Sequence, residues 1–529
     1  MNIVDGHTIR SRQKHDFEVV IVGSGPAGAA TARTLARAGA KVAVVEAGLY
    51  HPPASFSADS FAAMTSMYHR FGAALTLSLV PMPVVQGRAV GGTSVINGAI
   101  SWRLPQDVYE DWVESDPPLC DAIPWQTISS ALDEVEERLN IHPTDPSIAG
   151  PNNLLLGTGA EAMGLEHRPI SRNVKECEGL GRCLQGCPAA HKLSMDRTYL
   201  PDAVDAGATI FAGVEVKSIL ARRGRATGVR GRALGGGKVD FMADKVVVAA
   251  GAVHSPALIL RSRLRGGPTG QNFMCHPGVS MAGFFKEPLR MWTGATQGHE
   301  VVGLRREGIK FEALGYDYTL TAARLKGAGR EYARKIATLT NWANWGAAIK
   351  ATSRGKVSPS GRVRFSLNSE DMVKVRRSIS VLGQMMLAAG AEYVIPGVHG
   401  WDEKVEDAAR MAEFANKGSI KQKHYTMVAT HLFGTARMGS NPRKSVVGFD
   451  FQHHRTKNLY VVDSSVFPSN TGVNPQTSII ALATIAARAI AQNSDDTLAP
   501  PEPEPAGEQN LSTSEPSSTT NSEQAPSSL

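Results

Sequence analysis

The segment from Val19 to Glu46 constrains the fold more than any other, because it reads as strand, glycine turn, helix, strand and acid in one run. Residues 19–22 predict a short buried strand, and the sequence GSGPAG follows at residues 23–28. This order is typical of the first βαβ unit of a Rossmann-type dinucleotide-binding sheet. By itself it does not distinguish FAD from NAD.

Each small residue of this turn has a predicted task. Gly23 makes the tight turn, Gly25 lets a pyrophosphate approach the backbone, and Gly28 lets the helix that begins near Ala27 pack on the strand. The start of that helix offers free N–H groups and a positive dipole end to phosphate. Glu46 ends the second strand, where a carboxylate accepts hydrogen bonds from the adenosine ribose.

Length and composition fit an ordinary soluble globular protein. At 529 residues, of which 42% are hydrophobic, two domains that share an interface are expected. No apolar run approaches the ~20 residues that a membrane span needs. The first residues contain no apolar stretch of the kind found in signal peptides, so a cytoplasmic location is expected.

Charge is distributed unevenly along the chain. From Asp495 onward there are seven acidic residues and no Lys or Arg, so the net charge of +7 leaves about +14 on the remainder. Residues 494–529 are acidic and rich in Pro and Ser, and we expect a disordered tail. The basic remainder is consistent with a solvated surface, an acidic redox partner or an anionic surface; without a recognisable motif, nucleic acid is not expected.

Three further segments resemble one enzyme family. They are GGTSVING at 91–98, GAVHSPALIL at 251–260, and the pair HLFGTARMG at 431–439 and GVNPQTSIIALA at 472–483. The blocks resemble the signatures of the glucose–methanol–choline (GMC) oxidoreductases, which bind FAD. The resemblance runs from residue 17 to about residue 492.

The resemblance implies an α/β fold with a Rossmann-type FAD-binding domain and an inserted sheet-and-helix (α+β) substrate domain. The FAD-binding pieces are then 17–105, 190–275 and 425–493, and the substrate-binding pieces are 106–189 and 276–424. The acidic tail, 494–529, follows them.

Oxidation of an alcohol by hydride transfer needs a base for the hydroxyl proton, and a neutral imidazole is suited to this role. By resemblance, His431 is that general base and Asn474 holds the substrate oxygen against it. The resemblance also implies cofactor contacts at Gly92, Asn97, Val216, Asp463 and Pro475, with a helix that begins near Thr477 pointing at the flavin.

Cys177, Cys183 and Cys187 follow one another at close spacing, with Pro188 after the last. Three thiolates on one loop are able to hold an iron–sulfur cluster or zinc, although zinc usually needs a fourth ligand. The spacing resembles the [3Fe–4S] loop of cytochrome-linked sugar dehydrogenases in the family, and also the cysteine-rich loops of its long-chain alcohol oxidases. A cluster, a zinc site and a structural loop therefore remain open.

The predicted function is FAD-dependent oxidation of a small-molecule alcohol or sugar, with O₂ or an electron-transfer protein as acceptor. Two alternatives accompany it. One is a hydroxynitrile-lyase-like protein that keeps FAD without redox turnover. The other is a cytochrome-linked dehydrogenase that carries the iron–sulfur cluster.

Overall fold

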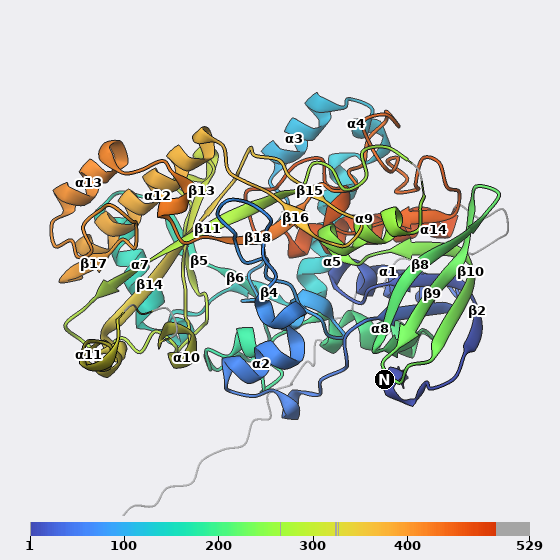
Figure 1. Ribbon diagram of the computed structural model, residues 1–529, viewed down its shortest axis with the longest axis horizontal. Helices are drawn as coiled ribbons and strands as arrows, with labels where there is room; N and C mark the ends of the chain where they lie inside the picture. The colour runs from blue at the N-terminus through green and yellow to red at the C-terminus, as the bar shows by residue number, and fades with distance from the viewer. Residues whose placement is uncertain (1, 265, 323–324, 326, 493–529) are drawn as a thin grey trace, which may run out of the picture.

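Two β-sheets organise the molecule, one toward each end of the view in Figure 1. The computed structural model describes residues 2–264, 266–322, 325 and 327–492. The predicted tail, 494–529, lies outside the described residues. In the described part, no helix is both long and apolar enough to cross a membrane.

The first sheet has eight strands and a parallel centre. Its order is β1 (Ile3–Asp5), β7 (Thr209–Ala212), β3 (Val42–Glu46), β2 (Gln13–Val22), β10 (Lys238–Val248), β9 (Arg225–Ala233) and β8 (Val214–Arg222), and β19 (Leu459–Val461) pairs with β10. β2 lies parallel to β3 and to β10, whereas β9 is antiparallel to β10. Parallel neighbours require crossover connections, which helices supply here.

The predicted strand, turn and helix are present at the start of this sheet. Gly23 has a φ of +100°, a left-handed conformation that favours glycine. A Cβ on Gly28 would lie 2.0 Å from the Gly23 carbonyl oxygen, so only glycine lets α1 (Pro26–Arg37) approach the end of β2 so closely. α1 packs on β2 and β3, and α9 (Gly251–Arg261) packs on β8. α8 (Tyr199–Asp205) and α14 (Gln476–Gln492) pack on α1, and α5 (Trp125–Arg138) packs on α14.

The second sheet is antiparallel. Its order is β17 (Tyr393–Ile395), β11 (Met274–Phe284), β14 (Trp342–Ile349), β13 (Ile309–Ala313), β12 (His299–Val301) and β5 (His167–Pro169), and β18 (Val428–Phe433) pairs with β11. α7 (Pro151–Ala162) and α12 (Ser369–Ala388) pack on it, and α13 (Ala408–Lys417) packs on α12. Large buried side chains, among them Phe311 and Trp345, fill the space between sheet and helices.

Shorter elements surround the two sheets. They are α2 (Ser60–Met67), α3 (Gln106–Ser115), α4 (Leu119–Ala122), α6 (Pro146–Ala149), α10 (Tyr318–Ala322), α11 (Gly329–Ala337), and the strand pairs β4 (Ile141–Pro143) with β6 (Ser171–Asn173) and β15 (Lys356–Val357) with β16 (Val363–Arg364). A Rossmann-type sheet joined to a second sheet with helices confirms the predicted fold class. The residue boundaries of the two domains stay a prediction.

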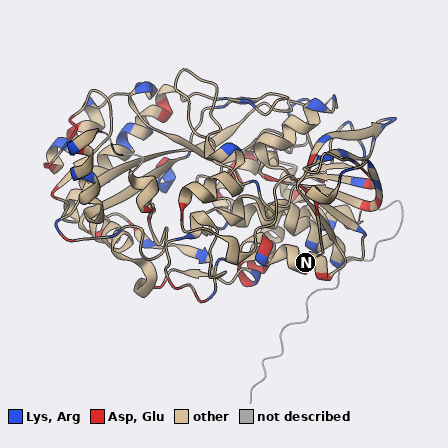
Figure 2. Cartoon of the chain, turned by 60° about the horizontal axis from the view of Figure 1, so that its bottom comes forward, with Lys and Arg blue, Asp and Glu red and all other residues tan. Residues whose placement is uncertain are grey.

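In the ribbon of Figure 2, the positions of Lys and Arg are interspersed with those of Asp and Glu along much of the chain. Many form exposed pairs, such as Lys404 with Glu406 and Arg410 with Asp402. Such pairs contribute little to stability.

Candidate active site

A cavity of about 1380 Å³ is lined by residues of both sheets. Ten of the predicted site residues line it: Gly23, Gly25, Glu46, Gly92, Asn97, Val216, His431, Asp463, Asn474 and Pro475. Gly28 does not, because it faces the end of β2. The volume exceeds the ~300–1,000 Å³ of ordinary small-ligand pockets, so a dinucleotide and a substrate have room side by side.

Two glycines close the nucleotide end of the cavity. A Cβ on Gly92 would lie 2.7 Å from the Cα of Gly25, so the turn after β2 touches the loop at 91–98. The Glu46 carboxylate accepts hydrogen bonds from Ser24 N at 2.9 Å and from Gly48 N at 2.8 Å. It therefore fixes the turn that leads into α1 as well as facing the cavity.

The other predicted cofactor contacts bring distant segments together. The register of β8 against β9 shifts between Val216 and Ser218, an irregularity in the ladder next to the cavity. The buried Asp463 carboxylate accepts hydrogen bonds from Gly251 N at 2.9 Å and from Ser465 N at 2.8 Å. It thus ties the C-terminal segment to the start of α9.

The start of α14 carries an unused donor. Asn97 Nδ2 donates to Gln476 Oε1 at 2.6 Å, whereas Gln476 Nε2 is buried without a partner among the described residues. The helix directly follows Pro475, and the first N–H groups of a helix lack intrahelical acceptors. Donors gathered at one cavity wall fit the acceptor-rich edge of a flavin ring, so the residues present are compatible with FAD.

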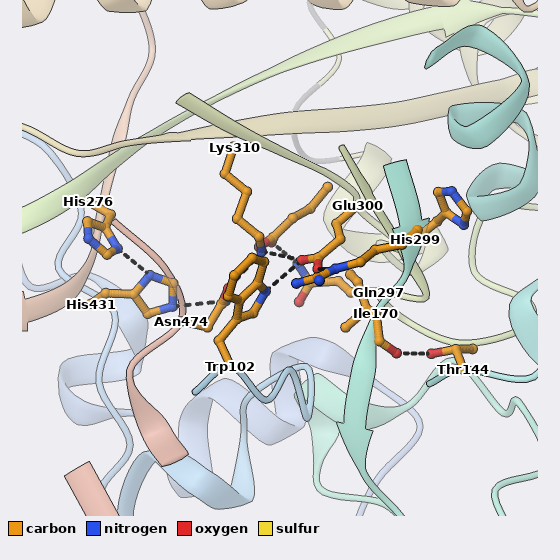
Figure 3. A network of polar contacts seen from close by, with 12 residues as sticks. Trp102, Thr144, Ile170, His276, Gln297, His299, Glu300, Lys310, His431 and Asn474 are labelled. Carbon is orange, nitrogen blue, oxygen red and sulfur yellow. Dashed lines mark hydrogen bonds and ion pairs between the residues drawn. The ribbon is translucent and has the colours of Figure 1, made fainter. Parts of the chain in front are cut away.

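His431 lies in a β-bulge of β18. Met274 pairs with Phe433 and His276 pairs with Thr430, so two residues of β18 face one residue of β11. His431 has a φ of +52°, which costs a non-glycine residue about 1 kcal/mol. The bulge re-aims the imidazole into the cavity, and Figure 3 shows it lying between His276 and Asn474.

The second histidine, His276, contacts the first. The two Nδ1 atoms lie 3.1 Å apart, and Gly472 N donates to His276 Nε2 at 3.0 Å. A backbone N–H only donates, so this contact leaves the proton of a neutral His276 on Nδ1. His276 then donates to His431 Nδ1, and the proton of His431 is on Nε2.

The opposite tautomer also has support. The Asn470 side chain interacts with His276, and its buried Oδ1 has no partner in the described part of the chain. Asn470 Nδ2 donates to Ala351 O at 2.7 Å, so Oδ1 is the atom left to accept. A proton on His276 Nε2 would leave His276 Nδ1 free to accept from His431 Nδ1, with the lone pair of His431 on Nε2.

Asn474 is oriented by a buried lysine. Lys310 Nζ donates to Asn474 Oδ1 at 2.9 Å, which turns the amide Nδ2 toward His431 Nε2 at 3.4 Å (Figure 3). Because a cation cannot face an N–H group favourably, Lys310 excludes the flipped amide. The structure thus brings the predicted catalytic pair together.

Lys310 belongs to a buried polar network. It pairs with Glu300 Oε2 at 2.8 Å and with Glu312, and Trp102 Nε1 donates to Glu300 at 2.8 Å. Arg168 also pairs with Glu300, at 2.9 Å. Although burial lowers it, the two glutamates hold the pKa of Lys310 above its ordinary value, so the residue is charged.

The pKa values of both histidines are low. Burial, and then the nearby Lys310, lower the pKa of His431 to about 3. Burial, followed by the charges of His431 and Lys310, lowers the pKa of His276 well below its ordinary range. Both rings are therefore neutral near pH 7.

No motif in the sequence points directly to Lys310, Glu300, Glu312 or Asn470 as residues of the site. One signal was available: Lys310 and Glu312 are two apart in a strand, so they share a face, and charged residues on a buried strand are uncommon.

The geometry of the three clustered cysteines does not support a metal centre. Arg172 Nη2 lies 3.1 Å from Cys183 Sγ, and Nη1 lies 3.6 Å from Cys177 Sγ, so a cation occupies the position between two thiols. The adjoining cavity, which Cys187 also lines, measures about 20 Å³, enough for about one water. Within the described ranges, no three His, Cys, Asp or Glu side chains are placed to hold a metal ion. The predicted [3Fe–4S] cluster is therefore not supported.

A Rossmann-type cavity with a histidine and an amide at its far end is consistent with a dinucleotide-dependent oxidoreductase. The sequence pattern of the GMC oxidoreductases matches residues 64–278 and 348–483, and that of the pyridine nucleotide-disulphide oxidoreductases matches residues 17–66. The chain belongs to the GMC oxidoreductase family, and this membership supports FAD as the cofactor.

Individual proteins resemble the chain over most of its length. An uncharacterized GMC-type oxidoreductase of Mycobacterium tuberculosis is 34% identical over 472 residues, which cover 88% of this chain and 74% of the relative. A long-chain-alcohol oxidase of Arabidopsis thaliana is 28% identical over 498 residues, 87% of this chain and 65% of the relative. The crystal structure of pyridoxine 4-oxidase from Mesorbium loti matches with a TM-score of 0.68 at 18% identity, covering 90% of this chain and 100% of that one. At this identity, the structural match shows the shared fold.

Proposed function

We propose that the protein oxidises an alcohol to an aldehyde or ketone, with FAD as cofactor, His431 as general base and Asn474 as the group that holds the substrate oxygen. The observation that carries the proposal is the placement of His431 Nε2 and Asn474 Nδ2, 3.4 Å apart on one wall of the cavity. An alcohol oxygen between them accepts from the amide and gives its proton to the imidazole.

The role of Asn474 and the role of His431 each depend on a neighbouring residue. Lys310 turns the Asn474 amide so that its N–H group faces the substrate oxygen. His431 accepts at Nε2 when its own proton is on Nδ1, which requires His276 to accept at Nδ1 and to donate from Nε2. When bound, FAD supplies the acceptor for the hydride.

After the proton has moved to His431 Nε2, the Nε2–H and the Asn474 amide both point at the product oxygen. Two donors aimed at one oxygen stabilise the charge that builds up on it as the C–H bond breaks. His431 and Asn474 therefore act both when the hydroxyl proton is removed and when charge builds up on the oxygen.

The substrate that we propose is an alcohol with an apolar body. Six apolar residues near the second sheet line the cavity: Met281, Met291, Leu314, Leu325, Trp342 and Ile395. Apolar walls bind a hydrocarbon body by removing it from water. The Arabidopsis relative whose name includes long-chain alcohols is consistent with this choice.

The test is anaerobic mixing of the purified flavoprotein with a series of primary alcohols of increasing chain length and, in parallel, with glucose. Flavin bleaching that becomes faster with chain length supports the proposal. Bleaching by glucose alone would overturn the substrate class. A flavin that stays oxidised with every alcohol would overturn the reaction and favour a lyase-like role.

Re-oxidation of the reduced flavin identifies the acceptor. We propose O₂, because the structure does not support an iron–sulfur cluster through which electrons would pass to a cytochrome. Rapid return of the flavin bands on mixing with aerated buffer supports this choice, and slow return would favour an electron-transfer protein.

A further inference from the structure

An exposed hairpin at residues 75–83 presents leucines to solvent. It is closed by the bridge between Leu75 and Pro83 and by the Thr76 N–H donating to Met82 O at 2.9 Å. Leu75 is 53% exposed, Leu77 48% and Leu79 fully exposed. We call residues 75–83 the leucine hairpin.

Along the leucine hairpin the apolar side chains face outward and the polar ones face inward, the reverse of the usual pattern in a strand at the surface of a protein in water. The leucines face outward, whereas Thr76 is buried, with its hydroxyl 3.2 Å from Ser78 Oγ. Ser78 Oγ in turn donates to Val80 O at 2.7 Å. The polar side chains thus satisfy one another inside the hairpin, and the apolar ones are left half or fully exposed. Such an arrangement suits insertion into an apolar medium.

Basic residues flank two segments that contact the hairpin near its tip. Leu77 N donates to Val363 O at 2.6 Å, between Arg362 and Arg364, and Gln422 Nε2 donates to Val80 O at 3.3 Å, between Lys421 and Lys423. These four cations, which we call the basic collar, are exposed and have no ion-pair partner among the residues that the structure describes.

The surroundings of the collar reinforce its charge. Residues 68–88, 350–368 and 417–424, which meet at the hairpin, contain no Asp or Glu. Lys356 pairs across from Arg364 in the strands β15 and β16, so two like charges face each other without a neutralising acid between them. Ile420, which precedes Lys421, adds one more exposed apolar side chain. Figure 1 shows the leucine hairpin as a blue loop beside β18 and β15.

We propose that the leucine hairpin and the basic collar dock the protein on the surface of an anionic lipid bilayer. The leucines enter the headgroup region, and the four cations contact lipid phosphates. An apolar tip with a cationic rim matches the two layers of such a surface, one apolar and one negatively charged. A protein partner would need an apolar pocket with an acidic rim, for which this chain offers no independent indication.

Docking would bring the cavity to the membrane. Gly72 and Pro83, at the two ends of the hairpin segment, line the cavity, and so do Tyr425 and Thr426, close to the collar. An apolar alcohol dissolved in the bilayer would then reach the active site without crossing water. The docking itself does not depend on the proposed reaction, because it is measured by binding.

The experiment is co-sedimentation of the full-chain, FAD-loaded protein with vesicles of phosphatidylglycerol and phosphatidylcholine in equal amounts, and with vesicles of phosphatidylcholine alone. We expect sedimentation with the anionic vesicles, weakened by salt. The L77S/L79S variant should bind roughly tenfold more weakly, and the K421Q/K423Q variant roughly 10- to 30-fold more weakly.

The matched control is L154S/L234S, which removes two leucines on α7 and in the turn after β9 whose exposure is similar to that of Leu77. Its binding should equal that of the unmodified protein, and an unchanged flavin spectrum would show that every variant is folded. The proposal is overturned if the protein stays in the supernatant with both kinds of vesicle. It is also overturned if L77S/L79S binds as well as the control, which would mean that charge alone adsorbs the protein.

Discussion

The Nδ1 atoms of His276 and His431 lie 3.1 Å apart, so a single proton lies between the two buried, neutral imidazoles, bound to one Nδ1 or to the other. Which ring holds it decides whether His431 Nε2 is a base or a donor. The Gly472 N–H group donates to His276 Nε2 and favours the donor form. The unpaired Asn470 Oδ1 would accept from a proton on His276 Nε2 and so favour the base form; we therefore expect these two groups to influence the reactivity of the site.

The first prediction concerns Asn470 as a positioning residue. Asn470→Leu removes the acceptor for a proton on His276 Nε2, so kcat for alcohol oxidation should fall roughly tenfold while KM and the flavin spectrum stay unchanged. Asn470→Asp supplies a stronger acceptor and should retain activity. Equal losses in both variants would point to packing and not to proton placement.

The second prediction concerns pH. Because burial and Lys310 lower the pKa of His431 to about 3, the base loses its activity only as pH falls through that value. The kcat/KM for alcohol should therefore be flat between about pH 5 and about pH 8, without an acid limb near the ordinary histidine pKa of ~6.5.

A double variant tests whether Lys310 lowers the pKa of His431. K310M/E312Q removes the cation together with one of its acids, which raises the pKa of His431 and should move the acid limb to higher pH. A profile identical to that of the unmodified protein would show that Lys310 does not act on the base.

The third prediction concerns stability. Lys310→Met alone leaves Glu312 buried without its cation and Glu300 with Arg168 as its remaining cation, which should cost about 3–5 kcal/mol of unfolding free energy in urea titration. K310M/E312Q should recover part of this loss. Lys404→Met, which breaks an exposed pair with Glu406, serves as control and should unfold at an unchanged midpoint.

The fourth prediction concerns the nucleotide end of the cavity. A Cβ on Gly92 would press on Gly25, so Gly92→Ala should weaken FAD binding by about 10- to 100-fold in a fluorescence titration of the apoprotein. Gly207→Ala is the control: its φ is also positive, at +100°, but its Cβ would contact nothing within 4 Å. That variant should lose some stability and no FAD affinity.

The fifth prediction concerns the cysteines. With Arg172 between Cys177 and Cys183, the pure protein should show a flavin spectrum without stoichiometric iron. Cys187→Ser should leave that spectrum unchanged. About three irons per chain, with a broad absorption shoulder that Cys187→Ser abolishes, would contradict the structure.

The sequence predicted features that depend on neighbouring residues better than contacts between residues far apart in the chain. The strand, turn and helix from β2 to α1 depend on neighbouring residues, and they lie where the glycine spacing indicates. The contact between Lys310 and Asn474 joins residues far apart in sequence, and no local pattern reports it. The bulge at His431 is also invisible locally, because it depends on how β18 pairs with β11.

For the cysteine cluster a local sequence pattern was present, but the pattern alone was not enough to predict the site. Its spacing is compatible with a metal loop, but spacing does not tell where the sulfurs point or which neighbour reaches them. Arg172 comes from β6, outside the loop, and its guanidinium determines the surroundings of both thiols. Although burial raises it, Arg172 and Lys192 bring the pKa of the Cys183 thiol below its ordinary value, which suits an ion pair with Arg172.

The packing of α14 on α1 has a consequence for biosynthesis. The two helices are separated by more than 400 residues, yet they lie side by side, and the wall that holds Asn474 and Gln476 belongs to the later one. At ~5–20 residues per second, a ribosome takes roughly 20–90 s to pass from the first to the second. During that interval the nascent chain has the turn at residues 23–28 without the cavity wall that α14 supplies, so we expect tight capture of the cofactor to await α14.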